Sequence, residues 1–150
     1  MKMLAENRKA RFNYALHDQW EAGLVLQGWE VKSAKAAQVS LAESFIHLEA
    51  ATGELWLKNA YFAPYAMGDT REQVTHRNRK LLLHRAEIAK IAKACLVKGN
   101  TCVPLSLYLD SAGLIKLKVA VGTGKHTYDK KETIKQRDLA RETAREIKRG

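Results

Sequence analysis

Two strand-like segments joined by a short turn constrain the fold of this chain more than any other feature. Residues 102–109 are nearly all apolar, whereas residues 115–121 alternate apolar side chains with lysine or alanine. Alternation with a period of two is typical of a strand with one buried face, and the Asp-Ser-Ala-Gly sequence at 110–113 supplies the turn. The pattern predicts an antiparallel hairpin in which Pro104 lies at a strand start, an edge or a bulge.

Shorter strand signals precede this hairpin. The expected strands are, in chain order, one beginning at residues 14–16, then 24–33, 45–49 and 55–62, the last two joined by a turn at 52–53. The apolar run at 81–83 fits either a buried strand or the start of a helix. Pro64 and Gly68 mark a loop that continues to about residue 78. These short strands predict a mainly β domain.

Helical signals are fewer. The period changes to that of a helix over residues 84–98, and Gly99 ends the segment. We expect single helical turns at residues 18–22, which begin with an N-cap-like aspartate, and at residues 40–43, which have capping-box spacing. Five or six strands with one main helix and short helical turns predict a small OB-like Greek-key barrel.

The two ends of the chain differ from this middle part. The first eleven residues are polar and basic, and we expect a mobile arm. The Gly-Thr-Gly sequence at 122–124 predicts a break, which divides a barrel domain at 1–124 from a basic C-terminal tail at 125–150. The tail has nine Lys and Arg against five Asp and Glu, and few apolar side chains. Isolated helices of this length are marginal in water, so we expect disorder in the free protein and a helix on binding.

The charge of the chain indicates a polyanionic partner. Its 150 residues include 26 Lys and Arg but only 16 Asp and Glu, a formal net charge of +10. Lysine and arginine that meet phosphates release condensed counterions, so nucleic acid is favoured over a merely soluble basic protein. No segment reaches the roughly 18 apolar residues of a spanning helix, and the N-terminus lacks the apolar part of a signal peptide. We therefore expect a cytoplasmic protein with no membrane partner.

The sequence contains no recognisable catalytic or metal site. Cys95 and Cys102 lack metal-ligand spacing and are interpreted as reduced core thiols. No two of the five histidines are spaced as ligands on a helix, no serine lies in a nucleophile elbow, and no glycine-rich loop fits a phosphate. We expect a protein that is not an enzyme and that needs no cofactor or metal.

Basic clusters are the best candidates for binding. Arg71, Arg77, Arg79, Lys80 and Arg85 surround the long loop and the start of the main helix, where acidic side chains are rare. Lys32 with Lys35, Lys116 with Lys118, and Arg8, Lys9 and Arg11 form further groups. Tyr61, Phe62 and Tyr65 could stack on unpaired bases, although such rings are more often part of a core. His76 and His126 stand in basic surroundings, where an RNA contact and ordinary polar packing are equally good interpretations.

Several ordered blocks of sequence resemble one known family. They are Asn-Arg-Lys-Ala-Arg-Phe-Asn-Tyr at 7–14, Glu-Ala-Gly-Leu-Val-Leu-Gln-Gly-Trp-Glu-Val-Lys-Ser at 21–33, Arg-Asn-Arg-Lys-Leu-Leu-Leu at 77–83, and Tyr-Asp-Lys-Lys and Ile-Lys-Gln-Arg-Asp at 128–131 and 134–138. In this order they are similar to the SsrA-binding proteins, also called the small protein B family. The resemblance extends over nearly the whole chain, which makes it far more specific than any one block.

The resemblance implies a concrete function. Members of this family have an OB-like barrel, bind the tRNA-like domain of transfer-messenger RNA (tmRNA, or SsrA RNA) and deliver it to stalled ribosomes for trans-translation. Their tail occupies the empty mRNA channel near the decoding centre of the small subunit. The chain would be a monomer without catalytic activity. The residues alone leave an alternative open, a general OB-fold RNA-binding or ribosome-associated accessory protein.

The resemblance also suggests which residues bind. The expected RNA-binding residues are Glu30, Lys32, Arg77, Arg79, Lys80, Lys125 and His126, and the expected ribosome-contacting tail residues are Tyr128, Asp129, Lys130, Lys131, Lys135 and Arg137. Glu30 would accept hydrogen bonds from base or ribose donors, or would instead pair with Lys32 or an arginine. Lys131 stands where the family usually has arginine, so a bidentate or stacked contact there is lost.

Overall fold

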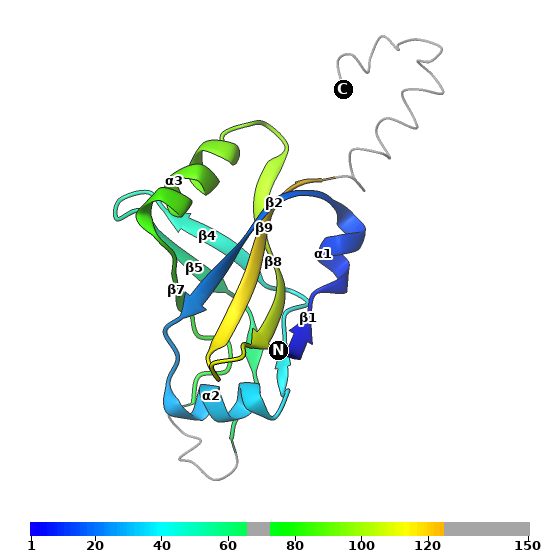
Figure 1. The fold of residues 1–150 in the computed structure, drawn as a ribbon, viewed down its shortest axis with the longest axis vertical. Coiled ribbons are helices and arrows are strands. Elements are labelled where there is room, and N and C mark those ends of the chain that lie inside the picture. Colours follow the sequence, from blue (N-terminus) through cyan, green and yellow to red (C-terminus); the bar gives the residue numbers. More distant parts are fainter. Residues whose placement is uncertain (66–72, 125–150) are drawn as a thin grey trace.

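A computed structural model describes residues 1–65 and 73–124 of the chain (Figure 1). The predicted tail and part of the predicted loop at 64–78 lie outside the described residues. The elements are, in chain order, β1 (Lys2–Glu6), α1 (Arg8–Asn13), β2 (Tyr14–Leu24), α2 (Gly28–Lys35), β3 (Val39–Ser40), β4 (Phe45–Glu49), β5 (Glu54–Lys58), β6 (Tyr61–Phe62), β7 (Arg79–Leu82), α3 (Arg85–Ala94), β8 (Asn100–Leu109) and β9 (Ile115–Gly124). The prediction of a mainly β chain is confirmed.

One antiparallel sheet forms the body of the molecule. Its strand order is β1-β8-β9-β2-β7-β5-β4, and β3 and β6 form a separate small sheet. The predicted hairpin is β8 and β9, with Leu109 opposite Ile115 beside the turn. Their register shifts between Pro104 and Ser106, where a proline without an N–H interrupts the ladder least.

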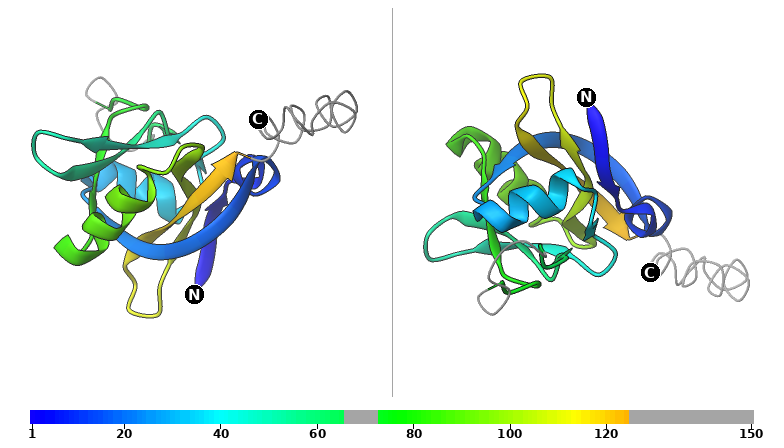
Figure 2. Two further views of the ribbon diagram at one scale, coloured as in Figure 1. Left: turned by 90° about the horizontal axis from the view of Figure 1, so that it is seen from above. Right: turned by 90° about the horizontal axis from the view of Figure 1, so that it is seen from below.

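The sheet curls around the larger of two apolar clusters. Its last strand, β4, also lies against β8, and β2 bends around one side of the molecule when it is viewed end-on (Figure 2). Leu57, Leu107, Leu117 and Val119 are fully buried in this cluster, whereas Leu105 belongs to a smaller cluster that includes Ala10 of α1. The helix α3 lies at one end of the sheet and α2 at the other (Figure 1). The surfaces around these two helices therefore lie at opposite ends of the molecule.

The N-terminal segment is part of the fold, so the prediction of a mobile arm at 1–11 is wrong. Strand β1 pairs with β8, and Leu4 and Ala10 are buried. The Asn7 side chain accepts a hydrogen bond from the Ala10 backbone N–H, which caps α1, and donates to the Pro104 carbonyl. The sequence of this segment is polar because most of it faces solvent, while the pairing with β8 and the buried Leu4, Asn7 and Ala10 hold it in place.

Two predictions between residues 18 and 33 are also wrong. Residues 18–22 lie in the middle of β2, because this segment pairs with β9, and they are not a helical turn. Residues 28–33 belong to α2, not to a strand. The helix starts at a capping box between Gln27 and Glu30, and its buried residues follow helical spacing.

Smaller corrections concern the ends of other elements. Residues 40–43 contain the end of β3 and a turn without a helix. The segment 122–124 is not a break, since β9 continues to Gly124 opposite Tyr14 of β2. The described chain has three helices where one main helix was expected, although the helix predicted at 84–98 is confirmed as α3. The run at 81–83 belongs to strand β7 and its end.

Candidate nucleic-acid interface

Glu30 lies in the interior and is bound by two arginines. Its carboxylate accepts bonds from Arg77 Nη2 at 2.6 Å, Arg77 Nε at 3.1 Å and Arg79 Nε at 2.7 Å, and from the Gln27 backbone N–H at 2.7 Å. The side chains of Glu30 and Arg79 are both 0% exposed. The sequence left open whether Glu30 pairs with Lys32 or with an arginine. In the structure it pairs with Arg77 and Arg79.

Arg79 organises the chain around this carboxylate. Its guanidinium donates to the carbonyls of Ala60, Arg77 and Thr75 at 2.9 to 3.0 Å, and it stacks on the Phe62 ring with Cζ 3.9 Å from the ring centroid. One side chain thereby ties the backbone at Ala60, Thr75 and Arg77 to the start of α2. Neither Glu30 nor Arg79 is open to a nucleic acid in this structure.

The two buried charges stabilise each other. Burial alone would raise the pKa of Glu30, but hydrogen bonds from Arg77 and Gln27 and the charge of Arg79 hold this pKa below its ordinary value. Burial lowers the pKa of Arg79, and the Glu30 carboxylate opposes that shift. Both groups carry their charge at neutral pH, so the buried pair is an ion pair.

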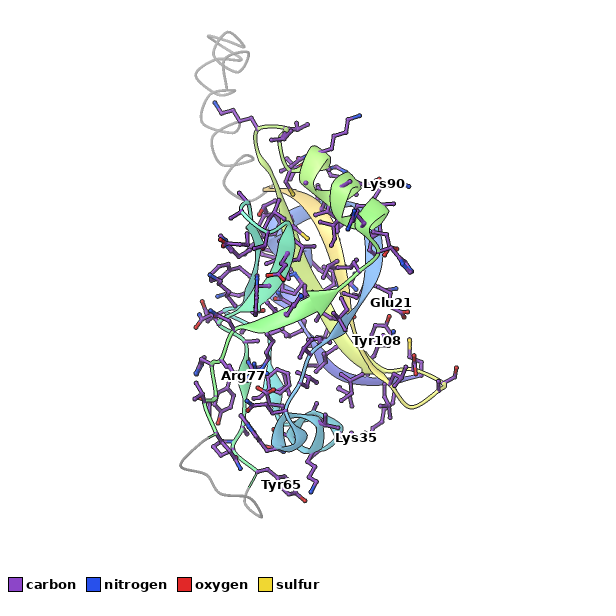
Figure 3. All side chains as sticks on the ribbon, turned by 90° about the vertical axis from the view of Figure 1, so that its left-hand side faces the viewer. Glu21, Lys35, Tyr65, Arg77, Lys90 and Tyr108 are labelled. Atoms are coloured by element: carbon purple, nitrogen blue, oxygen red, sulfur yellow. The ribbon has the colours of Figure 1, made fainter. Side chains whose placement is uncertain are left out.

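Arg77 is where this network reaches the surface. Its side chain is 27% exposed, and its fork is fixed by Glu30 and by the Val25 carbonyl. Lys32 projects from α2, with Nζ 5.4 Å from the centroid of the Tyr65 ring. Tyr61 and His76 lie with ring centroids 5.3 Å apart. Figure 3 shows Arg77 and Tyr65 at the same end of the molecule as α2.

This surface, formed by Lys32, Tyr61, Tyr65, His76 and Arg77, is called the α2 face below. It combines cations with aromatic rings, which is the combination that binds phosphates and unpaired bases. Because Arg77 is held by a buried carboxylate, its orientation is set before any ligand arrives.

Lys80 stands apart from the α2 face. It lies on β7 and forms a half-exposed ion pair with Glu54, with Nζ and Oε2 2.9 Å apart. The remaining predicted residues lie outside the described part of the chain. They are Lys125, His126, Tyr128, Asp129, Lys130, Lys131, Lys135 and Arg137.

Sequence reasoning missed a cleft on the sheet. It has a volume of about 470 Å³ and is lined by Glu21, Gly23, Leu82, Leu83, His84, Glu87 and Lys116. Leu82 is 50% exposed, and Glu21 accepts a hydrogen bond from the Tyr108 hydroxyl (Figure 3). The charge of Lys116 was visible in the sequence, but only the pairing of β2 with β7 and β9 places it beside Leu82 and Glu21.

Among residues 1–65 and 73–124, no group of three or more His, Cys, Asp or Glu is arranged to hold a metal ion. Cys95 and Cys102 are both free thiols, and burial raises the pKa of Cys102 to about 12, which makes it a poor nucleophile. No helix in the described part of the chain is long and apolar enough to cross a membrane. What the described surface offers is cations and rings for binding.

Comparison with known proteins identifies the family. A model of the SmpB protein family matches residues 4–149. This chain belongs to the SmpB family. It is 47% identical over 149 residues to the SsrA-binding protein of Coprothermobacter proteolyticus, covering 99% of this chain and 98% of that protein. It is also 47% identical over 148 residues to the SsrA-binding protein of Bartonella henselae, covering 99% and 92%.

A solved structure agrees with the SmpB assignment. Described as "tmRNA-SmpB: a journey to the center of the bacterial ribosome", it matches with a TM-score of 0.68 and 40% identity, over 86% of this chain and 92% of that one. The resemblance seen in the sequence is thereby confirmed. In this SmpB-family chain the block at 21–33 runs from β2 into α2, and the block at 77–83 contains β7. The network of Glu30, Arg77 and Arg79 connects these two blocks.

Proposed function

We propose that this protein binds transfer-messenger RNA and delivers it to stalled ribosomes in trans-translation. The observation that carries the proposal is the SmpB-family match over nearly the whole chain, including the far C-terminal part. The relatives are named for binding SsrA RNA, and the solved relative is described with tmRNA and the ribosome. The role is one of binding, without catalysis. Because translation takes place there, it locates the protein in the bacterial cytoplasm.

We further propose that residues 1–124 form an OB-like Greek-key barrel and residues 125–150 a separate tail. The sheet order, together with the approach of β4 to β8, supports a barrel in which β2, β7, β5, β4, β8 and β9 follow one another. The tail begins where β9 ends at Gly124, at the α3 end of the sheet (Figure 1). This arrangement supports a barrel that binds folded RNA and a tail that contacts a different partner.

The α2 face is the first RNA-binding surface that we propose. Lys32 and Arg77 bind phosphates, and the rings beside them stack on bases. Glu30 and Arg79 act indirectly, because they hold Arg77 and the backbone at Thr75 in place. Lys80, Lys125 and His126 extend the basic surface beyond this face.

The cleft around Leu82 and Lys116 is the second RNA-binding surface that we propose. An apolar side chain beside a lysine suits a ribose or base face next to a phosphate. The Glu21 carboxylate accepts hydrogen bonds there, and unpaired bases and 2′-hydroxyls carry the donors for them.

The tail carries the ribosomal part of the function. Its residues Tyr128, Asp129, Lys130, Lys131, Lys135 and Arg137 contact the small subunit, and the tail occupies the mRNA channel when no message fills it. The sparse apolar residues of the tail support this role, since a strongly amphipathic helix would dock on the barrel instead.

Truncation tests the division of labour. Removing residues 129–150 should leave the affinity for tmRNA within about twofold, measured by gel shift, and abolish tagging on stalled ribosomes in a reconstituted translation system. The variant Arg77→Ala should instead weaken tmRNA binding itself, and tagging should fall with it and recover at higher protein concentration. If bulk tRNA displaces tmRNA as readily as unlabelled tmRNA does, the protein is a general RNA binder instead. If truncation destroys tmRNA affinity, the proposed boundary is wrong.

A further inference from the structure

One row of residues crosses four strands beside the cleft that contains Lys116. Tyr108 of β8 lies opposite Lys116 of β9. Lys116 lies opposite Gly23 of β2, which in turn lies opposite Leu82 of β7. Residues that face each other across paired strands lie on the same side of a sheet. Leu107, the neighbour of Tyr108, belongs to the apolar core, so this row lies on the outer face. We call the cleft along it, lined by Glu21, Gly23, Leu82, Leu83, His84, Glu87 and Lys116, the Lys116 cleft.

Tyr108 stands at the β8 end of this row and is buried although it lies on the outer face. It is 4% exposed and does not line the Lys116 cleft. A buried tyrosine hydroxyl needs a hydrogen-bond partner, and this one donates to Oε2 of Glu21 (Figure 3). Burial, together with the hydrogen bond to the Glu21 carboxylate, raises the pKa of Tyr108. The phenol therefore keeps its proton and remains a donor toward Glu21.

Glu21 is exposed, and the Tyr108 hydroxyl is what holds its carboxylate. Within residues 1–65 and 73–124, no other group donates to this carboxylate. Lys118 lies opposite Glu21 on β9, but in the same described residues neither Lys118 nor Lys116 forms an ion pair with it. A neutral donor thus fixes one oxygen and leaves the negative charge uncompensated. Oε1 and the remaining lone pair of Oε2 are available to a ligand.

This arrangement sorts the parts of an RNA ligand. A carboxylate repels phosphate, so a strand that enters the cleft places a phosphate at Lys116 and turns a donor group toward Glu21. The donors of RNA are the N–H groups of unpaired bases and the 2′-hydroxyls. Because Tyr108 holds the Glu21 side chain before the RNA arrives, less side-chain freedom is lost on binding.

We propose that Tyr108 is a positioning residue for RNA binding in the Lys116 cleft. It does not touch the RNA, and it acts by aiming the Glu21 carboxylate at a donor group of an unpaired nucleotide. A solely structural role would make the hydroxyl matter for stability but would not couple it to Glu21 in the affinity for RNA. The inference rests on the proposed function, since the RNA is the tmRNA that the cleft is proposed to bind.

A double-mutant cycle on the full-length protein tests this coupling. Tyr108→Phe removes only the hydroxyl and should weaken the binding of full-length tmRNA about fivefold, the size of an ordinary hydrogen bond. In a Glu21→Gln background the same change should alter the affinity by less than about twofold, because the carboxylate that it positions is already gone. Ser106→Ala is the matched control. It removes another buried hydroxyl two residues earlier in β8 and should leave the affinity within about twofold, as measured by gel shift.

Two further readouts separate positioning from other roles. Tyr108→Phe should leave the slope of log affinity against log salt unchanged, whereas Lys116→Ala should reduce it by about one, because only the lysine contacts a phosphate. Glu21→Asp keeps the charge but draws the carboxylate back from the Tyr108 hydroxyl by one carbon. It should therefore bind tmRNA nearly as weakly as Glu21→Gln.

Other outcomes contradict the inference in recognisable ways. An unchanged affinity of Tyr108→Phe, or additive losses in the cycle, would show that Tyr108 does not act through Glu21. A changed salt slope for Tyr108→Phe, or tmRNA binding by Glu21→Asp equal to that of the unmodified protein, would overturn the inference as well. Failure of the unmodified protein to bind tmRNA would instead contradict the proposed function.

Discussion

At the scale of single residues, Arg79 decides most about the proposed RNA surface although it touches no solvent. It bonds to the Glu30 carboxylate and to the backbone carbonyls of Ala60, Thr75 and Arg77. Arg77 is exposed only in part, and its position is fixed by its ion pair with the same carboxylate. A buried ion pair is seldom a source of net stability, because desolvation costs about as much as the attraction gains. Its value here is geometric, since it fixes the direction of an exposed guanidinium.

Replacing Arg79 should therefore be costly. The variant Arg79→Met leaves Glu30 buried with one arginine and frees three carbonyls, and the loss of one partner of a buried pair costs about 3–5 kcal/mol. The free energy of unfolding in urea measures this loss. Lys80→Met is the matched control on the next residue, where the half-exposed pair with Glu54 predicts a much smaller effect. Equal losses for the two variants would show that burial of the pair does not matter.

The same network predicts a dependence of stability on pH. The pKa of Glu30 is lower in the folded protein than its ordinary value of 4.5, so the ionised carboxylate favours folding. This contribution is fully present above about pH 4.5 and is lost as the pH falls through the lower folded pKa. The unmodified protein should lose stability over this range more steeply than Glu30→Gln, in urea titrations between pH 7 and pH 3. Parallel curves would contradict the ionised assignment.

At the scale of elements, close packing between β2 and β9 limits which residues the strands accept. Gly122 lies in β9, and a Cβ there would be 2.9 Å from Cβ of Tyr14 and 3.4 Å from Cδ2 of Leu16. Both contacts are with β2, the strand that carries the chain from α1 to α2. The glycine is needed for this approach.

Adding a methyl group at this position should destabilise the protein. Gly122→Ala forces β9 away from Tyr14, and overpacking of this kind costs about 1–3 kcal/mol. Gly124→Ala is the control in the same strand, because its Cβ would lie 3.9 Å from the nearest atom, an ordinary contact. Thermal unfolding should show a lower midpoint for the first variant and almost no change for the second. A similar drop for both would mean that flexibility, not space, is the reason for glycine.

At the scale of the whole molecule, the charge of +10 sets how the protein meets RNA. The cations are spread over the α2 face, the Lys116 cleft and helix α3, so different surfaces can bind phosphates at once. Such binding depends steeply on salt, because each neutralised phosphate releases counterions. The solved relative is described with tmRNA and the bacterial ribosome.

Salt dependence can therefore count the contacts. If about six phosphates are bound, the affinity for tmRNA should fall on the order of a thousandfold between about 50 and 200 mM salt. Arg77→Ala should reduce the slope of log affinity against log salt by about one. Lys2→Ala, at an exposed lysine on β1, should leave the slope unchanged. The slopes come from gel shifts over a salt series, and equal slopes for the two variants would remove Arg77 from the RNA surface.

Local patterns in the sequence were enough for those parts of the fold whose stability is local. The hairpin of β8 and β9 and the helix α3 carry their own periodicity and turns, and both are present. The net charge and the ordered blocks of sequence pointed to RNA and to the SmpB family before any contact was known, and the family is confirmed. The absence of motif spacing for catalysis was likewise a property of the sequence alone.

Only the tertiary structure decided the elements and contacts that depend on distant partners. Residues 18–22 are a strand because β9 pairs with them, and the N-terminal segment is ordered because β8 offers a free edge. The sequence placed Glu30, Arg77 and Arg79 in one candidate RNA site, but not in the same interior. Glu30 and Arg79 are 49 positions apart and become a buried ion pair only when the fold brings α2 beside the start of β7, with Arg77 joining them from the surface. The net charge is a sum over residues and follows from the sequence directly. Burial depends on which distant residues the fold packs against a side chain.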